Sequence, residues 1–175
     1  NFISDSNLLK SIVAASGISG EDTVVEIGCG AGTLTRALSE TAKKVYAFDI
    51  DAELKPVLAE TLAGCDNVEV IFRDFNKLDL KAFEGEIGRY AVVANLPYYI
   101  TTPLVTKLLE ESEKVESLSI MVQEEVAERF CAREGTPEYG SITAAIALKG
   151  SAKIVKRVSR NLFYPRPNMD SAVVK

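Results

Sequence analysis

Four consecutive residues, Asn95-Leu96-Pro97-Tyr98, place a side-chain amide, a rigid turn and an aromatic ring directly after the apolar run 90–94. The run predicts a buried strand, and ligands of open α/β sheets bind beyond the carboxyl ends of the strands. These residue types suit methyl transfer to an amine conjugated with a ring, such as the exocyclic amine of adenine. The lone pair of such a nitrogen is delocalised, so the amine needs help to become a nucleophile.

The expected help comes from hydrogen-bond acceptors placed on the two hydrogens of that amine. The Asn95 side-chain oxygen and a backbone carbonyl near Leu96 would favour the pyramidal form of the nitrogen, which attacks. Pro97 fixes its own φ and biases Leu96 toward an extended conformation, which aims that carbonyl outward. Tyr98 is suited to stack on the base. The tetrapeptide alone is equally compatible with a strand-terminating turn that carries a half-buried tyrosine.

The composition is that of one soluble globular domain. The chain has 175 residues, of which 47% are hydrophobic and 26% charged, enough for a sizeable core. No apolar run approaches the ~20 residues that a membrane span needs, so we expect neither a membrane span nor a signal peptide. Cys29, Cys65 and Cys131 are odd in number and form no CxxC motif, which argues for a reducing compartment and against a zinc site. We therefore expect a cytoplasmic protein without a metal.

Histidine is absent from the sequence. This excludes Ser-His-Asp and Cys-His nucleophile systems and most zinc enzymes. Methyl transfer from a sulfonium is compatible with the absence, because the methylated amine is cationic and loses its proton to water.

Charge is distributed unevenly along the chain. The formal net charge is −5, which argues weakly against a nucleic-acid partner. Residues 149–175, however, contain seven Lys or Arg residues and one acid, Asp170. This basic segment fits an edge that faces RNA and equally fits a solvated surface strand, and charge alone does not decide between them.

Strand and helix patterns alternate along the chain. Strands are predicted at 23–27, 44–49, 68–72, 90–94, 117–122, 152–158 and 172–174. Helices are predicted at 4–17, 33–42, 52–62, 77–83, 103–111, 124–132 and 141–148. The alternation indicates a parallel sheet with helices on both faces. Residues 159–170 are too few for a helical crossover, so the last two strands should pair antiparallel. Such an α/β, doubly wound, mostly parallel sheet with an antiparallel final strand is typical of class I (Rossmann-like) methyltransferases.

Three strand ends carry residues suited to a nucleoside cofactor. The first strand runs into Gly28-Cys29-Gly30-Ala31-Gly32, which departs from the dinucleotide fingerprint because Thr33 occupies its last glycine position. Asp49 ends the second strand, at the usual separation from the loop for a carboxylate that accepts from ribose hydroxyls. Asp74 ends the third strand, where it can accept from the amine of a bound adenine, and Phe75 beside it offers an apolar face.

Each of these features alone has an ordinary structural explanation: a tight turn, a helix cap and a loop aspartate. Ordered along one sheet edge together with Asn-x-Pro-Tyr, they indicate a site for S-adenosylmethionine. This cofactor has no pyrophosphate, so it does not require the third glycine of the dinucleotide loop.

The sequence resembles the ribosomal RNA adenine dimethyltransferases, both the KsgA type that acts on small-subunit RNA and the large-subunit relatives that confer macrolide resistance. The matching motifs run in order over nearly the whole chain. They are Asn1-Phe2-Ile3, Glu26-Ile27-Gly28-Cys29-Gly30-Ala31-Gly32, Asn95-Leu96-Pro97-Tyr98-Tyr99-Ile100-Thr101, Phe163-Tyr164-Pro165-Arg166-Pro167 and Asp170-Ser171-Ala172-Val173. Leu96-Pro97 and the ending look more like the small-subunit type.

The resemblance implies roles for individual residues. It implies cofactor contacts at Asn1, Ile3, Gly28, Gly30, Asp49, Asp74 and Asn95. It implies catalytic contacts with the target base at Asn95, Leu96, Pro97, Tyr98 and Phe163, the last on the other face of the base. The implied activity is S-adenosylmethionine-dependent dimethylation of adenine amines in small-subunit ribosomal RNA, by a monomer whose partner is the small ribosomal subunit.

Two departures from the family pattern affect RNA placement. Asn168-Met169 stands where Lys-Val is usual, and the helical C-terminal domain of the family is absent from the sequence. We expect residues 1–175 to form one catalytic domain. The alternatives are a large-subunit adenine methyltransferase, a non-catalytic ribosome-assembly or transcription factor, and an amide methyltransferase acting on protein glutamine.

Overall fold

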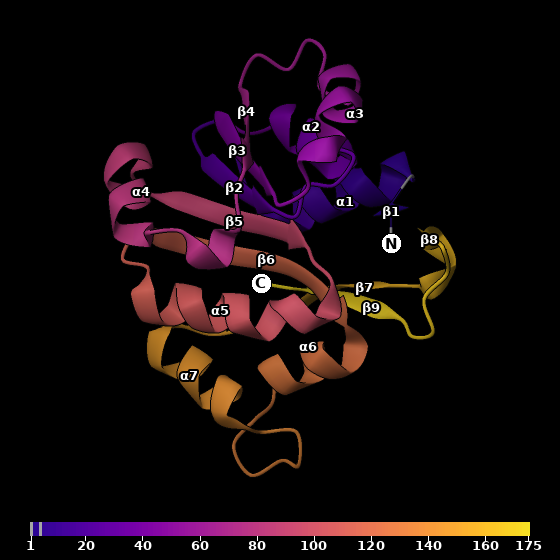
Figure 1. The fold of residues 1–175 in the computed structure, drawn as a ribbon. Coiled ribbons are helices and arrows are strands. Elements are labelled where there is room, and N and C mark those ends of the chain that lie inside the picture. Colours follow the sequence, from indigo (N-terminus) through magenta and orange to yellow (C-terminus); the bar gives the residue numbers. More distant parts are fainter. Residues whose placement is uncertain (1, 4) are drawn as a thin grey trace.

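The structure, a computed structural model, describes residues 2–3 and 5–175, and for Phe2, Ile3, Tyr98 and Tyr164 it describes the backbone alone. A seven-stranded sheet runs through the centre of the molecule (Figure 1). Its strands, in spatial order, are β4 (Val68–Phe72), β3 (Lys44–Asp49), β2 (Thr23–Ile27), β5 (Tyr90–Asn95), β6 (Val115–Gln123), β9 (Ser171–Val174) and β7 (Ile154–Val158).

The topology of this sheet confirms the predicted fold. Strands β4, β3, β2, β5 and β6 are parallel, and β9 runs antiparallel to both of its neighbours, β6 and β7. The chain moves outward from β2 to β4 and then returns to the other side of β2 to form β5. The carboxyl ends of β2 and β5 therefore flank the point where the winding reverses, which is where such sheets bind ligands.

Helices cover both faces of the sheet (Figure 1). One face carries α1 (Ser6–Ser16), α2 (Thr33–Ser39) and, after the 3₁₀ turn η1 (Ala52–Leu54), α3 (Lys55–Thr61). The other carries α4 (Leu80–Ile87), α5 (Tyr98–Glu111), α6 (Glu124–Phe130) and α7 (Ser141–Lys149). Two further 3₁₀ turns are η2 (Phe75–Lys77) and η3 (Arg160–Leu162).

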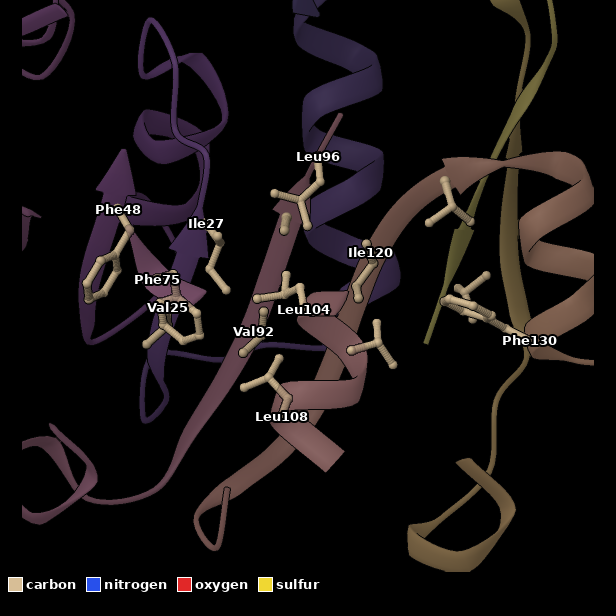
Figure 2. Close-up of a cluster of buried hydrophobic side chains, with 14 of the residues drawn as sticks. Val25, Ile27, Phe48, Phe75, Val92, Leu96, Leu104, Leu108, Ile120 and Phe130 are labelled. Atoms are coloured by element: carbon tan, nitrogen blue, oxygen red, sulfur yellow. The ribbon is translucent and has the colours of Figure 1, made fainter. Parts of the chain in front are cut away.

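The core consists of two main apolar clusters, one on each face of the sheet. Successive residues of a strand point to opposite faces. Val25 and Val92 accordingly pack in the cluster that includes Leu104 of α5 (Figure 2). Their neighbours Val24 and Val93 pack in the other cluster, with α1 and α2. The sheet is thus fixed between two dry layers, which makes its carboxyl edge a rigid support.

Helix α5 begins at Tyr98, earlier than the predicted Pro103. Pro97 occupies the N-cap position with φ −57°, and the buried Thr101 hydroxyl donates to the Pro97 carbonyl oxygen at 3.4 Å. Pro103 lies inside the helix on its exposed side, where its ring nitrogen has no hydrogen to donate to the Tyr99 carbonyl. Proline is favoured at helix starts, and Pro97 fulfils that role here.

Smaller differences concern other segments. The helix predicted at 77–83 is divided into η2 and α4, because Asp79 caps α4 by accepting from the Ala82 N–H at 3.0 Å. A two-stranded antiparallel sheet of β1 (Phe2–Ile3) and β8 (Phe163–Tyr164) was not predicted. Within residues 2–3 and 5–175, no helix is long and apolar enough to cross a bilayer.

Candidate active site

A cavity of about 680 Å³ opens at the carboxyl ends of β2, β3, β4 and β5, and is called here the carboxyl-edge cavity. Its volume lies within the range of roughly 300–1,000 Å³ that is usual for small-molecule sites. The predicted site residues that line it are Gly28, Gly30, Asp49, Asp74, Asn95, Leu96, Pro97 and Phe163. Residues from strands far apart in the sequence are thus brought to one place by the parallel topology.

The glycine loop after β2 is held against the end of β3. The N–H groups of Gly28 and Cys29 both donate to the Phe48 carbonyl, at 2.8 and 3.0 Å. Gly28 and Gly30 have φ values of 74° and 54°, which side chains disfavour. A Cβ added at Gly28 would also lie 3.3 Å from a methyl carbon of Leu96. The loop therefore follows a path that only glycine permits, and it exposes backbone to the cavity.

Asp49 ties the loop to β3. Its Oδ2 accepts from the Gly30 N–H at 2.8 Å, and its Oδ1 accepts from the Asp51 N–H at 3.0 Å. Asp51, in turn, caps η1 by accepting from the Glu53 N–H. A carboxylate oxygen accepts more than one hydrogen bond, so Asp49 retains acceptor capacity toward the cavity.

Asp74 occupies the equivalent place at the end of β4. Its Oδ1 accepts from the Asn76 N–H at 3.0 Å and caps η2. Phe75 beside it is buried and packs edge-on against Phe48, with ring centroids 5.1 Å apart. The second oxygen, Oδ2, forms an ion pair with the Lys77 ammonium group at 4.0 Å. The cap and this ion pair explain part of the presence of Asp74, which also lines the cavity.

Asn95 is the last residue of β5 and lies half-buried at the cavity. Within the described part of the chain, no hydrogen bond engages its side-chain amide. Leu96 is buried with its side chain against the glycine loop, and exposed Pro97 starts α5. Figure 2 shows Leu96 at the end of β5, beyond the core side chains Val92 and Leu104.

Phe163 reaches the cavity from the C-terminal loop between β7 and β9. It is 7% exposed and packs in the same apolar cluster as Leu9 and Met121. Arg160 and Asp170 hold the loop, because the Arg160 N–H donates to Asp170 Oδ1 at 2.9 Å and the Arg160 guanidinium donates to the Asn168 carbonyl at 2.7 Å.

Three predicted residues are not settled by these contacts. Asn1 lies outside the described residues. Ile3 pairs through its backbone with Phe163, so β1 runs beside the cavity loop, but its side chain is outside the description, as is that of Tyr98. The ligand-contact roles of all the predicted site residues, these three included, stay predictions.

Glu26, in the strand before the glycine loop, also lines the site, although the sequence motif did not predict a role for it. It lines the cavity although only 1% of it is exposed, and its Oε2 has no hydrogen-bond partner among the described residues. Burial raises the pKa of the Glu26 carboxyl to about 8; the neighbouring Thr35 hydroxyl opposes this rise, and the negative charge of Asp49 adds to it. A glutamate inside an otherwise apolar strand was the signal that could have identified it, since glutamate is rarely buried without a partner.

The chemistry of the cavity does not include a thiolate nucleophile. Burial raises the pKa of the Cys29 thiol to about 12, and Glu26 and Asp49 raise it further, so Cys29 is a neutral thiol at pH 7. In residues 2–3 and 5–175, no cluster of Cys, Asp or Glu side chains is arranged to hold a metal ion. The arrangement offers hydrogen-bond acceptors, exposed backbone and apolar surface, which suit binding and orientation of a nucleoside.

Two solved structures are similar over almost the entire chain. A 23S rRNA methyltransferase, ErmE, superposes with a TM-score of 0.86 at 30% sequence identity, covering 99% of this chain and 68% of that one. A dimethyladenosine transferase from Plasmodium falciparum superposes with a TM-score of 0.85 at 32% identity, covering 99% of this chain and 62% of that one.

Curated relatives and a family model agree with this likeness. A ribosomal RNA small subunit methyltransferase A from Geobacillus thermodenitrificans is 48% identical over 179 residues, which cover 100% of this chain and 61% of that protein. Its counterpart from Ligilactobacillus salivarius is 47% identical, covering 99% of this chain and 60% of that protein. This chain thus spans about 61% of the length of such relatives. The family model described as ribosomal RNA adenine dimethylase matches residues 1–175. The chain belongs to the ribosomal RNA adenine dimethylase family.

Proposed function

We propose that this chain dimethylates the exocyclic amines of adenines in small-subunit ribosomal RNA, with S-adenosylmethionine as the methyl donor. One observation carries the proposal: Asn95, whose amide has no partner in the described part of the chain, shares a cavity with the glycine loop, Asp49 and Asp74. The named activity of the relatives that are 47–48% identical supports the same reading.

The groups in the carboxyl-edge cavity fit S-adenosylmethionine. The unpartnered, buried Oε2 of Glu26 is an acceptor for the α-ammonium group of its methionine part. Asp49 would accept from the ribose hydroxyls, and Asp74 would accept from the adenine amine. Gly28 and Gly30 line the cavity without side chains, in a positive-φ path, so the ligand can approach the loop backbone closely. Bound there, S-adenosylmethionine supplies an electrophilic methyl group on a sulfonium.

Exposed apolar surface beside these acceptors also fits an adenosine. Ile50 follows Asp49 directly, lines the cavity and is 75% exposed. Burying it against an adenine ring would stabilise binding through removal of apolar surface from water. Asn1 and Ile3 are proposed as further cofactor contacts on the resemblance alone.

Asn95 and the backbone after it act on the target amine. The Asn95 side-chain oxygen and the Leu96 carbonyl accept from the two amine hydrogens, which orients the nitrogen lone pair toward the methyl group. The hydrogen bonds from the amine to these acceptors become stronger as the amine becomes cationic. They therefore stabilise the transition state more than the ground state. The cationic product then loses a proton to water, so the reaction needs no histidine.

The target base is held between apolar surfaces. Phe163 is proposed to contact one face of the adenine and Tyr98 the other. Base and cofactor can meet only if the adenine leaves its stack, so the substrate is expected to be a loop whose bases splay out. All of these groups come from one chain, so we propose that the enzyme acts as a monomer, in the cytoplasm where its cysteines stay reduced.

Methyl incorporation tests the proposal. The chain is incubated with labelled S-adenosylmethionine and either small or large ribosomal subunits that lack adenine dimethylation, and the RNA is digested to nucleosides. We expect dimethyladenosine from the small subunit alone. Label in large-subunit RNA alone would favour the ErmE-like alternative. Absence of label from both, with S-adenosylhomocysteine still binding, would favour a non-catalytic factor.

A further inference from the structure

We propose that Tyr99 is an RNA-binding residue whose ring stacks on a nucleotide that flanks the target adenine. The proposal rests on the proposed function and extends it from the base inside the cavity to the strand outside it. Tyr99 lines the carboxyl-edge cavity, yet it is 81% exposed. It therefore lies at the mouth of the cavity and does not fill the interior.

The position of Tyr99 in α5 fixes where its side chain lies. Thr101, Leu104 and Leu108 form the buried side of the helix. Tyr99 shares the opposite, exposed side with Thr102 and Pro103, since residues three and four apart occupy one helix face. The first turn is anchored by the Ile100 N–H, which donates to the Pro97 carbonyl at 3.1 Å. The ring thus extends to solvent from a rigid element, directly after the residues proposed to hold the target amine.

Contacts within the described part of the chain do not explain why position 99 carries an exposed aromatic ring. In residues 2–3 and 5–175, Tyr99 makes no hydrogen bond, ion pair or ring contact. A single exposed apolar residue is ordinary on a protein surface. Tyr99 differs from such a residue because it stands at the rim of the site, two positions after Pro97. Ile50, also highly exposed at this cavity, follows Asp49 on the cofactor side.

An RNA substrate would bring further nucleotides to Tyr99 at the mouth of the cavity. A flipped adenine remains joined to a nucleotide on each side, and both must cross the mouth of the cavity. Their bases lose stacking partners when the adenine leaves the stack, and an exposed aromatic face replaces one of them without reading sequence. Arg73 also lines the cavity, is exposed and has no carboxylate partner among the described residues. A cation in the cavity lining favours an anionic substrate such as RNA over a neutral protein segment.

The test compares Tyr99→Ala, Tyr99→Leu and Tyr99→Phe in methyl incorporation into unmethylated small subunits. Stacking on an aromatic ring predicts that Tyr99→Ala and Tyr99→Leu lower kcat/KM about 5- to 150-fold, mainly through KM for RNA, while Tyr99→Phe stays close to wild type. Affinity for S-adenosylhomocysteine and the melting temperature should not change. Tyr139→Ala is the matched control, because Tyr139 is another exposed tyrosine and lies in a loop away from the cavity lining.

Other outcomes overturn the inference. Wild-type kinetics for Tyr99→Ala, or for Tyr99→Leu, would show that no ring stacks there. A loss of S-adenosylhomocysteine affinity in Tyr99→Ala would assign the ring to the cofactor. Asn95→Ala separates this failure from failure of the proposed function: an inactive Asn95→Ala beside an unaffected Tyr99→Ala rejects only the stacking role, whereas an active Asn95→Ala rejects the proposed chemistry.

Discussion

Two buried glutamates lie at opposite ends of the strands: Glu26 at the carboxyl ends and Glu84 beside the start of β5. They differ in the hydrogen bonds that their carboxyl groups accept. Glu84 in α4 is 2% exposed, and its carboxylate accepts from the Tyr90 hydroxyl at 2.8 Å, the Glu113 N–H at 3.1 Å and the Ser112 hydroxyl. Glu26 is equally buried, but its Oε2 has no partner among the described residues.

The pKa values follow from these surroundings. Burial alone would raise the pKa of Glu84, but the hydrogen bonds from Ser112, Glu113 and Tyr90 outweigh it and hold that pKa below its usual value. For Glu26, burial dominates and raises the pKa to about 8. A saturated buried carboxylate serves the fold, whereas an unsaturated one beside a cavity is available to a ligand. Substitution of Glu84 should therefore change stability without changing ligand affinity, whereas substitution of Glu26 should change both.

Asn95→Ala should have the largest effect, which falls on activity and not on stability. Removing one preorganised group that acts in the transition state typically lowers kcat about 10²- to 10³-fold. The folded state loses no hydrogen bond, because the Asn95 amide has none in the described part of the chain. Single-turnover methyl transfer and thermal melting measure the two quantities. Asn95→Asp, which keeps an acceptor oxygen, should retain part of the activity; full activity in Asn95→Ala would remove this residue from the mechanism.

Glu26→Gln should change the pH dependence of stability. The Glu26 pKa is 4.5 without the protein environment and about 8 when folded. Between these values the folded state holds a proton that the unfolded state has lost, so wild-type stability decreases as pH rises from 4.5 to about 8. The variant lacks this component, which is on the order of 5 kcal/mol. Denaturant unfolding at pH 5 and pH 8.5 checks the slope.

Glu26→Gln should also lower the affinity for the cofactor. A cationic ammonium group favours ionised Glu26, so S-adenosylhomocysteine should displace a proton from the wild type at pH 7. Calorimetry in buffers of different ionisation enthalpy measures that proton. Equal proton release by wild type and Glu26→Gln would show that Glu26 does not meet the ligand.

Glu84→Gln should lower stability without changing cofactor affinity. The amide replaces an oxygen that accepts hydrogen bonds, so a donor at Ser112, Glu113 or Tyr90 loses its partner, at about 1–3 kcal/mol. Because the folded pKa of Glu84 is lowered, its contribution is present above pH 4.5 and is lost as pH falls through the folded value. The difference between variant and wild type should therefore shrink in acid. A change in S-adenosylhomocysteine affinity would show that the two ends of the strands are coupled.

Asp74→Asn should have the smallest effect. Asparagine caps helices as well as aspartate does, so the bond from the Asn76 N–H to residue 74 should persist and stability should stay unchanged. The loss of charge at the proposed adenine contact should weaken S-adenosylhomocysteine about tenfold, roughly 1.4 kcal/mol. Asp79→Asn, a cap on α4 away from the cavity lining, is the matched control and should bind normally.

The sequence was sufficient to locate the carboxyl edge, because each landmark follows its own strand and parallel strands end together. Asp49, Asp74 and Asn95 were placed in this way. The Glu84 network could not be found, since Glu84, Tyr90 and Ser112 belong to different elements and meet only in the folded chain. The same reason hid β1–β8, whose residues are far apart in sequence.

The start of α5 was misplaced for a local reason. Two prolines, Pro97 and Pro103, compete as helix starts, and sequence alone did not separate them. The buried Thr101 and its bond to the Pro97 carbonyl resolve the competition in favour of Pro97. This shift places Tyr99 in the first turn of a helix at the mouth of the cavity.

The central claim is that the cofactor binds in the carboxyl-edge cavity. Chemical-shift mapping of S-adenosylhomocysteine binding tests it most directly, because one experiment reports on this cavity and on the Glu84 network. The account predicts large amide shifts at Gly28, Gly30 and Asp49, and unchanged signals at Glu84 and Ser112. Shifts that gather around Ser112 while the glycine loop stays unperturbed would contradict it.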